Sequence, residues 1–173
     1  MASLLPAVDL GLMSNHLSAH EGVISKLKAY QRIVTNPKLR DIIRIQENVM
    51  QTHVWVMLAL INPDYSNYVE VPSLSNYGVH HHSIGEQNKK SNDNKWIALE
   101  VRNTAKTMAS TNYNSALMMQ DLNVKNAHIE MALQQQQLQK MYDDFITNIG
   151  WEFVPHSSFQ EQVNTYYHFK HLL

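Results

Sequence analysis

The stretch NPKLRDIIRIQENVMQTHVWVMLALINP, residues 36–63, decides the fold class of this chain. Between its two Asn-Pro pairs, one set of side chains recurs at spacings of three and four residues, the period of one face of an α-helix. The set is mostly apolar and consists of Leu39, Ile42, Ile43, Gln46, Val49, Met50, His53, Val56, Met57 and Leu60. Pro37 suits a first helical turn, where a missing N–H costs nothing, and Asn62-Pro63 stops the helix. The stretch therefore predicts a helix over residues 37–61.

Three further segments carry the same helical period: residues 10–34, 95–121 and 123–149. Asn92, Asp93 or Asn94 is expected to cap the third helix of the chain, because short polar side chains accept from the free N–H groups of a first turn. Gly150 is expected to close the fourth helix. The pattern thus predicts four long helices.

The last segment, residues 151–173, is rich in aromatic side chains. Trp151 and Phe153 are expected to fold back onto the end of the helices, since large apolar rings gain from burial. Residues 159–170 are expected to form a short packed helix.

The connections between the four long helices predict two antiparallel hairpins. The first two helices meet at Asn36-Pro37 and the last two near residues 121–123, and both links are tight. The crossover, residues 62–92, shows no sustained helical period and is long enough to traverse a helix of about 38 Å. Two hairpins joined by one long crossover form a ferritin-like four-helix bundle, and an up-down bundle is the alternative. We expect one all-α domain over residues 1–173.

The composition narrows the functional classes. The chain has 173 residues, a formal net charge of −1 and no cysteine. No basic surplus points to nucleic acid, and disulfides, thiolate metal sites and thiol catalysis are excluded. The first residues lack the basic region of a signal peptide, and no apolar run approaches about 20 residues, so we expect intracellular synthesis and no membrane span. Phosphate-loop, serine-hydrolase and zinc-protease motifs are absent, so nothing supports catalysis.

Several histidines are expected to meet at one level of the predicted bundle. Counted from the end where the first helix begins, His16, His20, His53 and His128 lie within about one helical turn of one another. One interpretation is a metal site for zinc or iron, in which Glu21 serves as a ligand or as an acceptor for a ligating imidazole.

The alternative interpretation is a polar layer without metal. There the imidazoles hydrogen-bond one another, Asn112 or Tyr113, and fix the register of the helices. No cofactor is expected in that case. A separate run, His80-His81-His82, falls in the crossover and is interpreted as part of a solvated loop.

One stretch also carries a resemblance to a known family. Residues 142–155, YDDFITNIGWEFVP, combine the end of a long helix with Gly-Trp, an aromatic residue and Val-Pro. Other matching positions, in chain order, are His20-Glu21, Tyr30, NPKLR at 36–40, His53, Tyr113 and DLNVK at 121–125. Together they resemble the spore coat protein F family of endospore-forming bacteria. The resemblance implies a ferritin-like bundle, localisation in the spore coat, and other coat or spore proteins as partners.

The ferritin-like comparison also bears on chemistry. Di-iron proteins of this fold carry a Glu from each of two helices and Glu-x-x-His from each of the other two. The counterparts here are Met50-x-x-His53 and Gln134-x-x-Gln137, so a di-iron ferroxidase centre is not expected.

The function predicted from these observations is a structural or assembly protein without catalytic activity. Dimerisation through a helix face is expected, with Trp55 and Trp96 as exposed apolar candidates. The alternative is a metal-binding bundle centred on the histidines.

Overall fold

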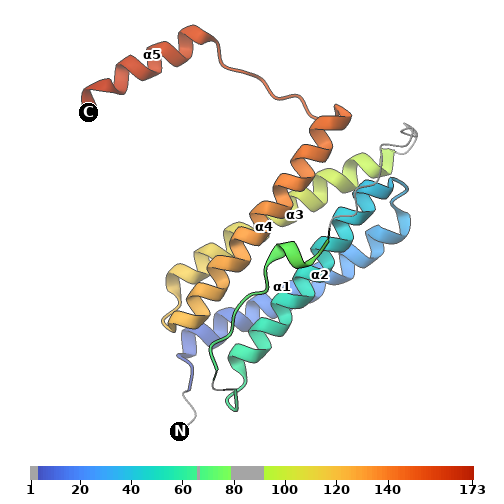
Figure 1. The fold of residues 1–173 in the computed structure, drawn as a ribbon, viewed down its shortest axis with the longest axis vertical. Helices are drawn as coiled ribbons and strands as arrows, with labels where there is room; N and C mark the ends of the chain where they lie inside the picture. The colour runs from blue at the N-terminus through green and yellow to red at the C-terminus, as the bar shows by residue number, and fades with distance from the viewer. Residues whose placement is uncertain (1–3, 66, 79–91) are drawn as a thin grey trace.

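The computed structural model describes residues 4–65, 67–78 and 92–173, and every regular element within these ranges is helical (Figure 1). The long helices are α1 (Ala7–Ile33), α2 (Pro37–Ile61), α3 (Asn92–Met118) and α4 (Leu122–Ile149). The shorter ones are α5 (Phe159–Phe169) and the 3-10 turns η1 (Leu74–Asn76) and η2 (Lys170–Leu172). The all-α fold class is confirmed. No described helix is long and apolar enough to cross a membrane.

The predicted bounds are correct for α2 and correct within one residue at each end of α4. Gly150 ends α4 in the left-handed conformation with φ of 73°, as expected, and Asn36 caps α2 by accepting from the Leu39 N–H. Helix α1 begins three residues earlier than expected, directly after Pro6. Asp9 lies in its first turn, where a carboxylate is favourable.

The prediction for α3 is wrong by three residues at both ends, and tertiary contacts explain the shift. Asn94 lies inside the helix, where its side chain donates to Thr35 Oγ1 over 2.8 Å and accepts from the Thr35 N–H over 3.1 Å. At the other end, the buried Asp9 carboxylate accepts from the N–H groups of Gln120 and Asp121 at 2.9 and 2.8 Å. These bonds hold the α3–α4 link in a non-helical conformation.

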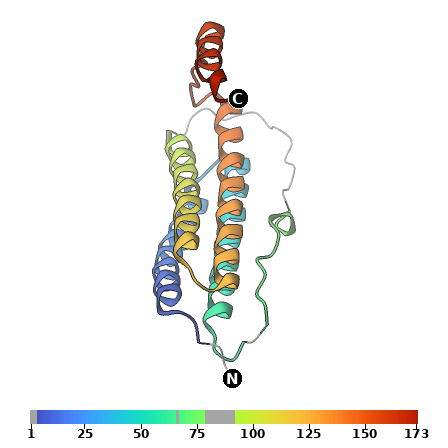
Figure 2. The same ribbon diagram turned by 90° about the vertical axis from the view of Figure 1, so that its left-hand side faces the viewer.

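Four helices pack as two antiparallel hairpins placed side by side. Helix α1 pairs with α2 and α3 pairs with α4, while α2 also packs on α4 and α1 on α3 (Figures 1 and 2). The described part of the crossover, residues 67–78, runs along the outside of the bundle (Figure 2). Asn123 exchanges two hydrogen bonds with the Val69 backbone, at 2.9 and 2.8 Å. Residues 79–91, including His80-His81-His82, lie outside the described residues.

A polar layer divides the interior of the bundle into two apolar clusters. One cluster contains Leu27, Leu39, Ile43, Val101 and Leu138, and the other contains Met13, Met57, Met119, Val124 and Met131. On every long helix, buried polar residues lie between the two sets: His16 and His20, then His53, then Asn112 and Ser115, then Gln134 and Gln135.

The aromatic tail departs from its predicted packing. Trp151 does pack on Phe145, with ring centroids 5.8 Å apart, but the side chain of Phe153 is 87% exposed. The predicted short helix exists as α5, yet it extends away from the bundle and has no buried residue (Figure 1). The short helix is therefore confirmed, and its packing against the bundle is wrong.

Candidate functional site

Three buried histidines of the polar layer meet a fourth, His128, which lies on α4 among residues of the second apolar cluster and contacts the His16 ring. We call these four residues, from three helices, the histidine layer: His16, His20, His53 and His128. All four side chains are at most 3% exposed. The ring centroids of His128 and His16 are 5.0 Å apart, those of His16 and His20 are 6.3 Å apart, and those of His20 and His53 are 5.7 Å apart. The sequence-based expectation that these four residues meet is confirmed, including His128.

One nitrogen of each imidazole is hydrogen-bonded. His20 Nδ1 donates to the His16 carbonyl at 2.7 Å, and His128 Nδ1 donates to the Val124 carbonyl at 2.9 Å. These bonds place the proton of each neutral ring on Nδ1, because a carbonyl oxygen only accepts.

Gln134 fixes the proton of a third ring. Its amide Nε2 donates to the Pro72 carbonyl at 2.7 Å, so its Oε1 accepts from His53 Nε2 at 2.9 Å. His53 is therefore protonated on Nε2, and the bond ties the layer to the crossover. His16 Nε2 lies 2.8 Å from Ser115 Oγ, where either atom can donate.

The second nitrogen of each imidazole is buried without a hydrogen-bond partner. These atoms are His16 Nδ1, His20 Nε2, His53 Nδ1 and His128 Nε2. Two amide oxygens, Asn112 Oδ1 and Gln135 Oε1, are likewise buried without a hydrogen-bond partner. Each buried polar atom without a hydrogen-bond partner lowers the stability of the fold by about 1–3 kcal/mol. A group of such atoms therefore indicates a site where a bound ion or molecule supplies the missing partners.

Burial keeps the histidine layer uncharged at neutral pH. Desolvation, aided by the neighbouring histidines, lowers the pKa of His16 to about 4 and that of His20 to about 3. Burial also lowers the pKa of His53 to about 4 against the raising effect of its bond to Gln134, and it lowers the pKa of His128. The rings therefore keep free lone pairs, the form in which imidazole binds metals.

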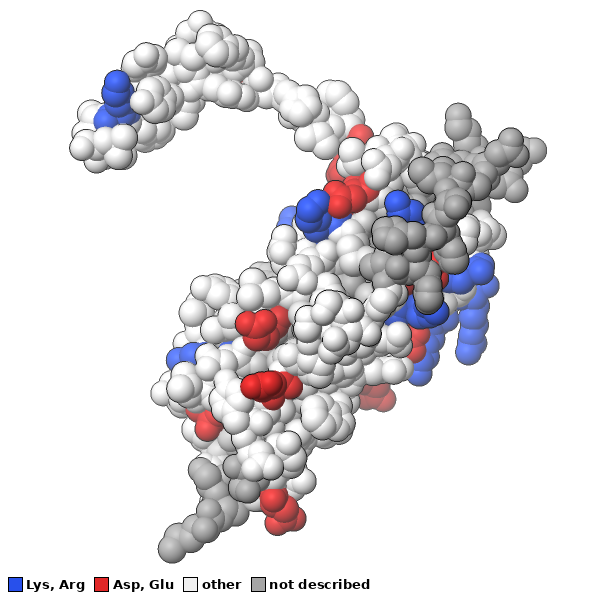
Figure 3. Space-filling view, viewed as in Figure 1, with Lys and Arg blue, Asp and Glu red and all other residues white. Residues whose placement is uncertain are grey.

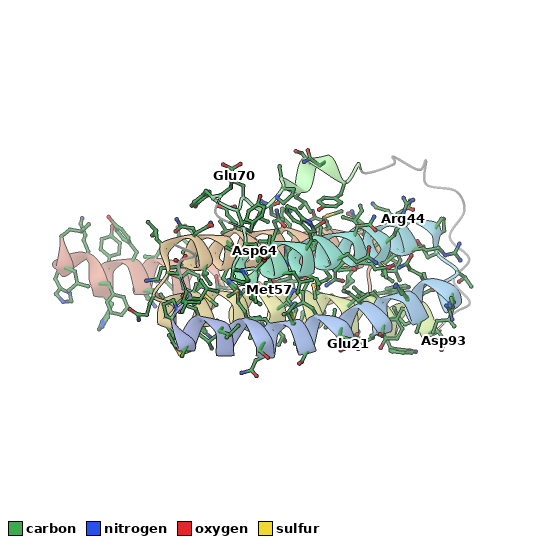
Figure 4. The ribbon with its side chains drawn as sticks, turned by 90° about the horizontal axis from the view of Figure 1, so that it is seen from below. Glu21, Arg44, Met57, Asp64, Glu70 and Asp93 are labelled. Atoms are coloured by element: carbon green, nitrogen blue, oxygen red, sulfur yellow. The ribbon has the colours of Figure 1, made fainter. Side chains whose placement is uncertain are left out.

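Several predicted partners lie elsewhere. Glu21 is exposed and points away from the bundle in Figure 4, so its predicted role as ligand or acceptor is wrong. A residue one step along a helix from an inward histidine is rotated by about 100°, which explains the error. Tyr113 is 51% exposed for the same reason, next to the buried Asn112. The hydroxyl that hydrogen-bonds an imidazole of the layer belongs to Ser115, not to Tyr113.

On α4, the inward-facing glutamines differ from the predicted pair Gln134 and Gln137. Gln134 is buried, but Gln137 is exposed, and the second inward amide is Gln135, whose Nε2 contacts Met50 Sδ at 3.1 Å. Trp55 and Trp96 are exposed by 55% and 45%, as expected.

The geometry limits the chemistry of the layer. The neighbouring buried carboxylate, Asp9, is engaged at the α3–α4 link, and among the described residues no group of three or more His, Asp, Glu or Cys side chains is arranged to hold a metal ion as the side chains lie. Ser115 and His16 form a hydroxyl–imidazole pair, but both are buried between helices, with no carboxylate on the imidazole.

Comparisons with models of known protein families, with curated proteins and with solved structures found no match to this chain.

Proposed function

We propose that this chain is a structural protein of the spore coat F type, a ferritin-like four-helix bundle that acts by assembling with copies of itself. Three arrangements support the ferritin-like topology: the two antiparallel hairpins, the contacts of α2 with α4 and of α1 with α3, and a connection that runs along the bundle. No step of the proposed function requires catalysis.

Several of the residues that carry the family resemblance hold structural positions, which fits a structural role. Asp121 caps α4 through bonds to the N–H groups of Asn123 and Val124, and Gly150 closes the same helix. Tyr30 packs edge-on against Trp96, with ring centroids 5.5 Å apart.

The observation that carries the assembly proposal is the exposure of α5. The helix is well specified, since Ser158 and Glu161 form a capping box at its start. It nevertheless exposes Phe159, Tyr166 and Phe169 by 81%, 54% and 54%. On the face shown in Figure 3 the tail lacks charged side chains except near its end. A helix of 11 residues is marginal alone in water, so α5 gains its stability by packing on another surface.

A second copy of the chain supplies a matching surface. Helix α2 exposes Trp55 and Leu58 by 55% and 54%, one helical turn apart on the outside of the bundle. The segment between α4 and α5 can extend over roughly 3.4 Å per residue, enough to carry α5 to a neighbouring molecule. Reciprocal exchange of two α5 helices would give a closed, two-fold dimer.

Sedimentation of the full chain over a wide concentration range tests this proposal. We expect a shift from monomer to dimer in the wild type, and a monomer in the double variant Phe159→Gln/Tyr166→Gln. The control, Asn164→Gln/His168→Gln on the opposite side of α5, should dimerise like the wild type. A wild type that stays monomeric, or dimers that persist in the first variant, would overturn assembly through α5.

Localisation provides an independent test of the spore coat assignment. A fluorescent fusion expressed in a sporulating bacterium should collect at the spore surface, and a fusion that stays diffuse in the mother cell would refute the assignment.

A further inference from the structure

We propose that the histidine layer binds one divalent transition-metal ion of the borderline-soft class, with Zn²⁺ as the representative ion. The site would use His16, His20, His53 and His128 and is independent of assembly through α5. Four observations support it.

The first observation is the way in which the rings are oriented. In metal sites, a ligating histidine donates its other ring N–H to a carbonyl or a similar acceptor, which fixes the ring and leaves the ligating nitrogen unprotonated. His20 and His128 donate to backbone carbonyls, and His53 donates to the Gln134 amide oxygen. Each of these rings is left with an unprotonated, buried and unpartnered nitrogen.

The second observation is the spacing of the rings. With a zinc–nitrogen distance of about 2.0 Å, two imidazoles on one tetrahedral ion have centroids roughly 5 Å apart. Of the six pairs among the four rings, the three in contact have separations of 5.0, 5.7 and 6.3 Å, which are equal to this value or exceed it by about an ångström. The free nitrogens do not converge as the side chains lie, so binding requires the rings to draw closer together.

The third observation is an imbalance between donors and acceptors. His20 Nε2, His53 Nδ1 and His128 Nε2 are buried acceptors, as are Asn112 Oδ1 and Gln135 Oε1. Among the described buried side chains, the amide donor without a partner is Gln46 Nε2. Helix packing alone leaves this surplus of lone pairs unsatisfied, and a cation satisfies several of them at once, where buried water is the competing partner.

The fourth observation, the chemistry of the donors, selects the class of ion. Neutral imidazole suits Zn²⁺, Co²⁺, Ni²⁺ and Cu²⁺, while Mg²⁺ and Ca²⁺ prefer oxygen ligands. Within residues 4–65, 67–78 and 92–173 no carboxylate joins the four rings, so nothing there is placed to bridge a pair of ions. Among the described residues, the acidic group that acts on the layer is Asp9, whose charge favours positive charge at His128.

Calorimetric titration with Zn²⁺ tests the site, using full chain made without an affinity tag or metal resin and stripped with a chelator. We expect one Zn²⁺ per chain, a rise in Tm, and visible absorption bands of tetrahedral Co²⁺ when cobalt replaces zinc. The variant His20→Gln/His53→Gln should lose binding. Gln134→Ala, which releases the His53 ring and also removes the bond to the Pro72 carbonyl, should weaken binding by roughly tenfold or more.

Two controls separate this site from adventitious binding. A variant with His80, His81 and His82 all changed to Asn, and His168→Gln on the exposed α5, should both bind Zn²⁺ like the wild type. A folded wild type with no zinc-dependent heat and no change in Tm would overturn the proposal and leave buried water as the partner of the free nitrogens. Binding lost in the triple variant but kept in His20→Gln/His53→Gln would also overturn it. If the double variant does not fold, the Co²⁺ spectrum of the wild type and the Zn²⁺ affinity of Gln134→Ala decide whether the histidine layer binds the metal.

Discussion

Acid should unfold the metal-free protein cooperatively, because the histidine layer binds protons only after unfolding. The pKa values of His16, His20 and His53 fall from an ordinary 6.5 to about 4, about 3 and about 4 in the folded chain. Above pH 6.5 these rings are neutral in both states and impose no penalty. As the pH falls from 6.5 towards 4, the unfolded chain gains protons that the folded chain cannot, so stability is lost in this window.

The magnitude follows from the number of rings. Each histidine that gains a proton only on unfolding lowers the free energy of unfolding by about 1.4 kcal/mol per pH unit. Three such rings give about 4 kcal/mol per pH unit well below pH 6.5, and His128, with its lowered pKa, adds in the same direction. The three rings together remove about 5 kcal/mol by roughly pH 5.3 and about 9–10 kcal/mol by pH 4. Domains have total stabilities of about 5–15 kcal/mol, so for a chain in the lower half of that range the acid transition should lie between about pH 4 and 5.5.

Urea titrations followed by circular dichroism, with a chelator present, measure this slope at several pH values. The variant His20→Leu/His53→Leu removes two of the rings and should reduce the slope by about half or more, while His168→Gln should leave it unchanged. A free energy of unfolding that stays constant between pH 6.5 and 5 in the wild type would show that the folded chain binds protons at these rings as readily as the unfolded chain does.

Three substitutions test the rest of the framework through the free energy of unfolding, measured by chemical denaturation at pH 7.5. Tyr142→Phe removes the buried hydrogen bond of 2.8 Å to Gln46 Oε1 and should lower the free energy of unfolding by about 1–3 kcal/mol. Adding Gln46→Leu should recover part of this loss, because it removes the unpaired amide. No loss of stability in Tyr142→Phe would contradict the bond. Asp9→Ala should cost about 2–4 kcal/mol, because two backbone N–H groups of the α3–α4 link lose a charged acceptor, and a neutral effect would show that the link holds without it. Gly150→Ala should cost about 1 kcal/mol, since a φ of 73° disfavours a side chain, whereas Gly22→Ala within α1 should not destabilise.

The sequence was most informative where local signals and packing agree. Asn-Pro pairs bound α2 on both sides, and Gly150 closes α4, so these positions could be predicted from local chemistry. The start of α3 could not, because Asn94 is held inside the helix by Thr35, which lies far away in the chain. The exposure of α5 was also beyond prediction, since an amphipathic pattern does not reveal which surface the helix packs on.

The same distinction applies to the site. Helical spacing and hairpin topology were sufficient to bring His16, His20, His53 and His128 together. Glu21 follows His20 in the sequence, but helical geometry turns it outwards, so adjacency in the sequence does not place it in the layer. The bond from His53 to Gln134 depends on side-chain orientation and on the path of the crossover. The helical spacing of buried residues in the sequence therefore cannot predict it.

In the folded chain the four histidines are neutral, buried and individually fixed by hydrogen bonds. Nitrogen NMR of the imidazole rings, recorded on chelator-treated protein from pH 7 to pH 5, reports the protonation state and tautomer of each ring. We predict protons on Nδ1 of His20 and His128 and on Nε2 of His53, with shifts that stay constant as long as the protein is folded. Rings with averaged shifts that titrate near pH 6.5 in the folded protein would contradict it.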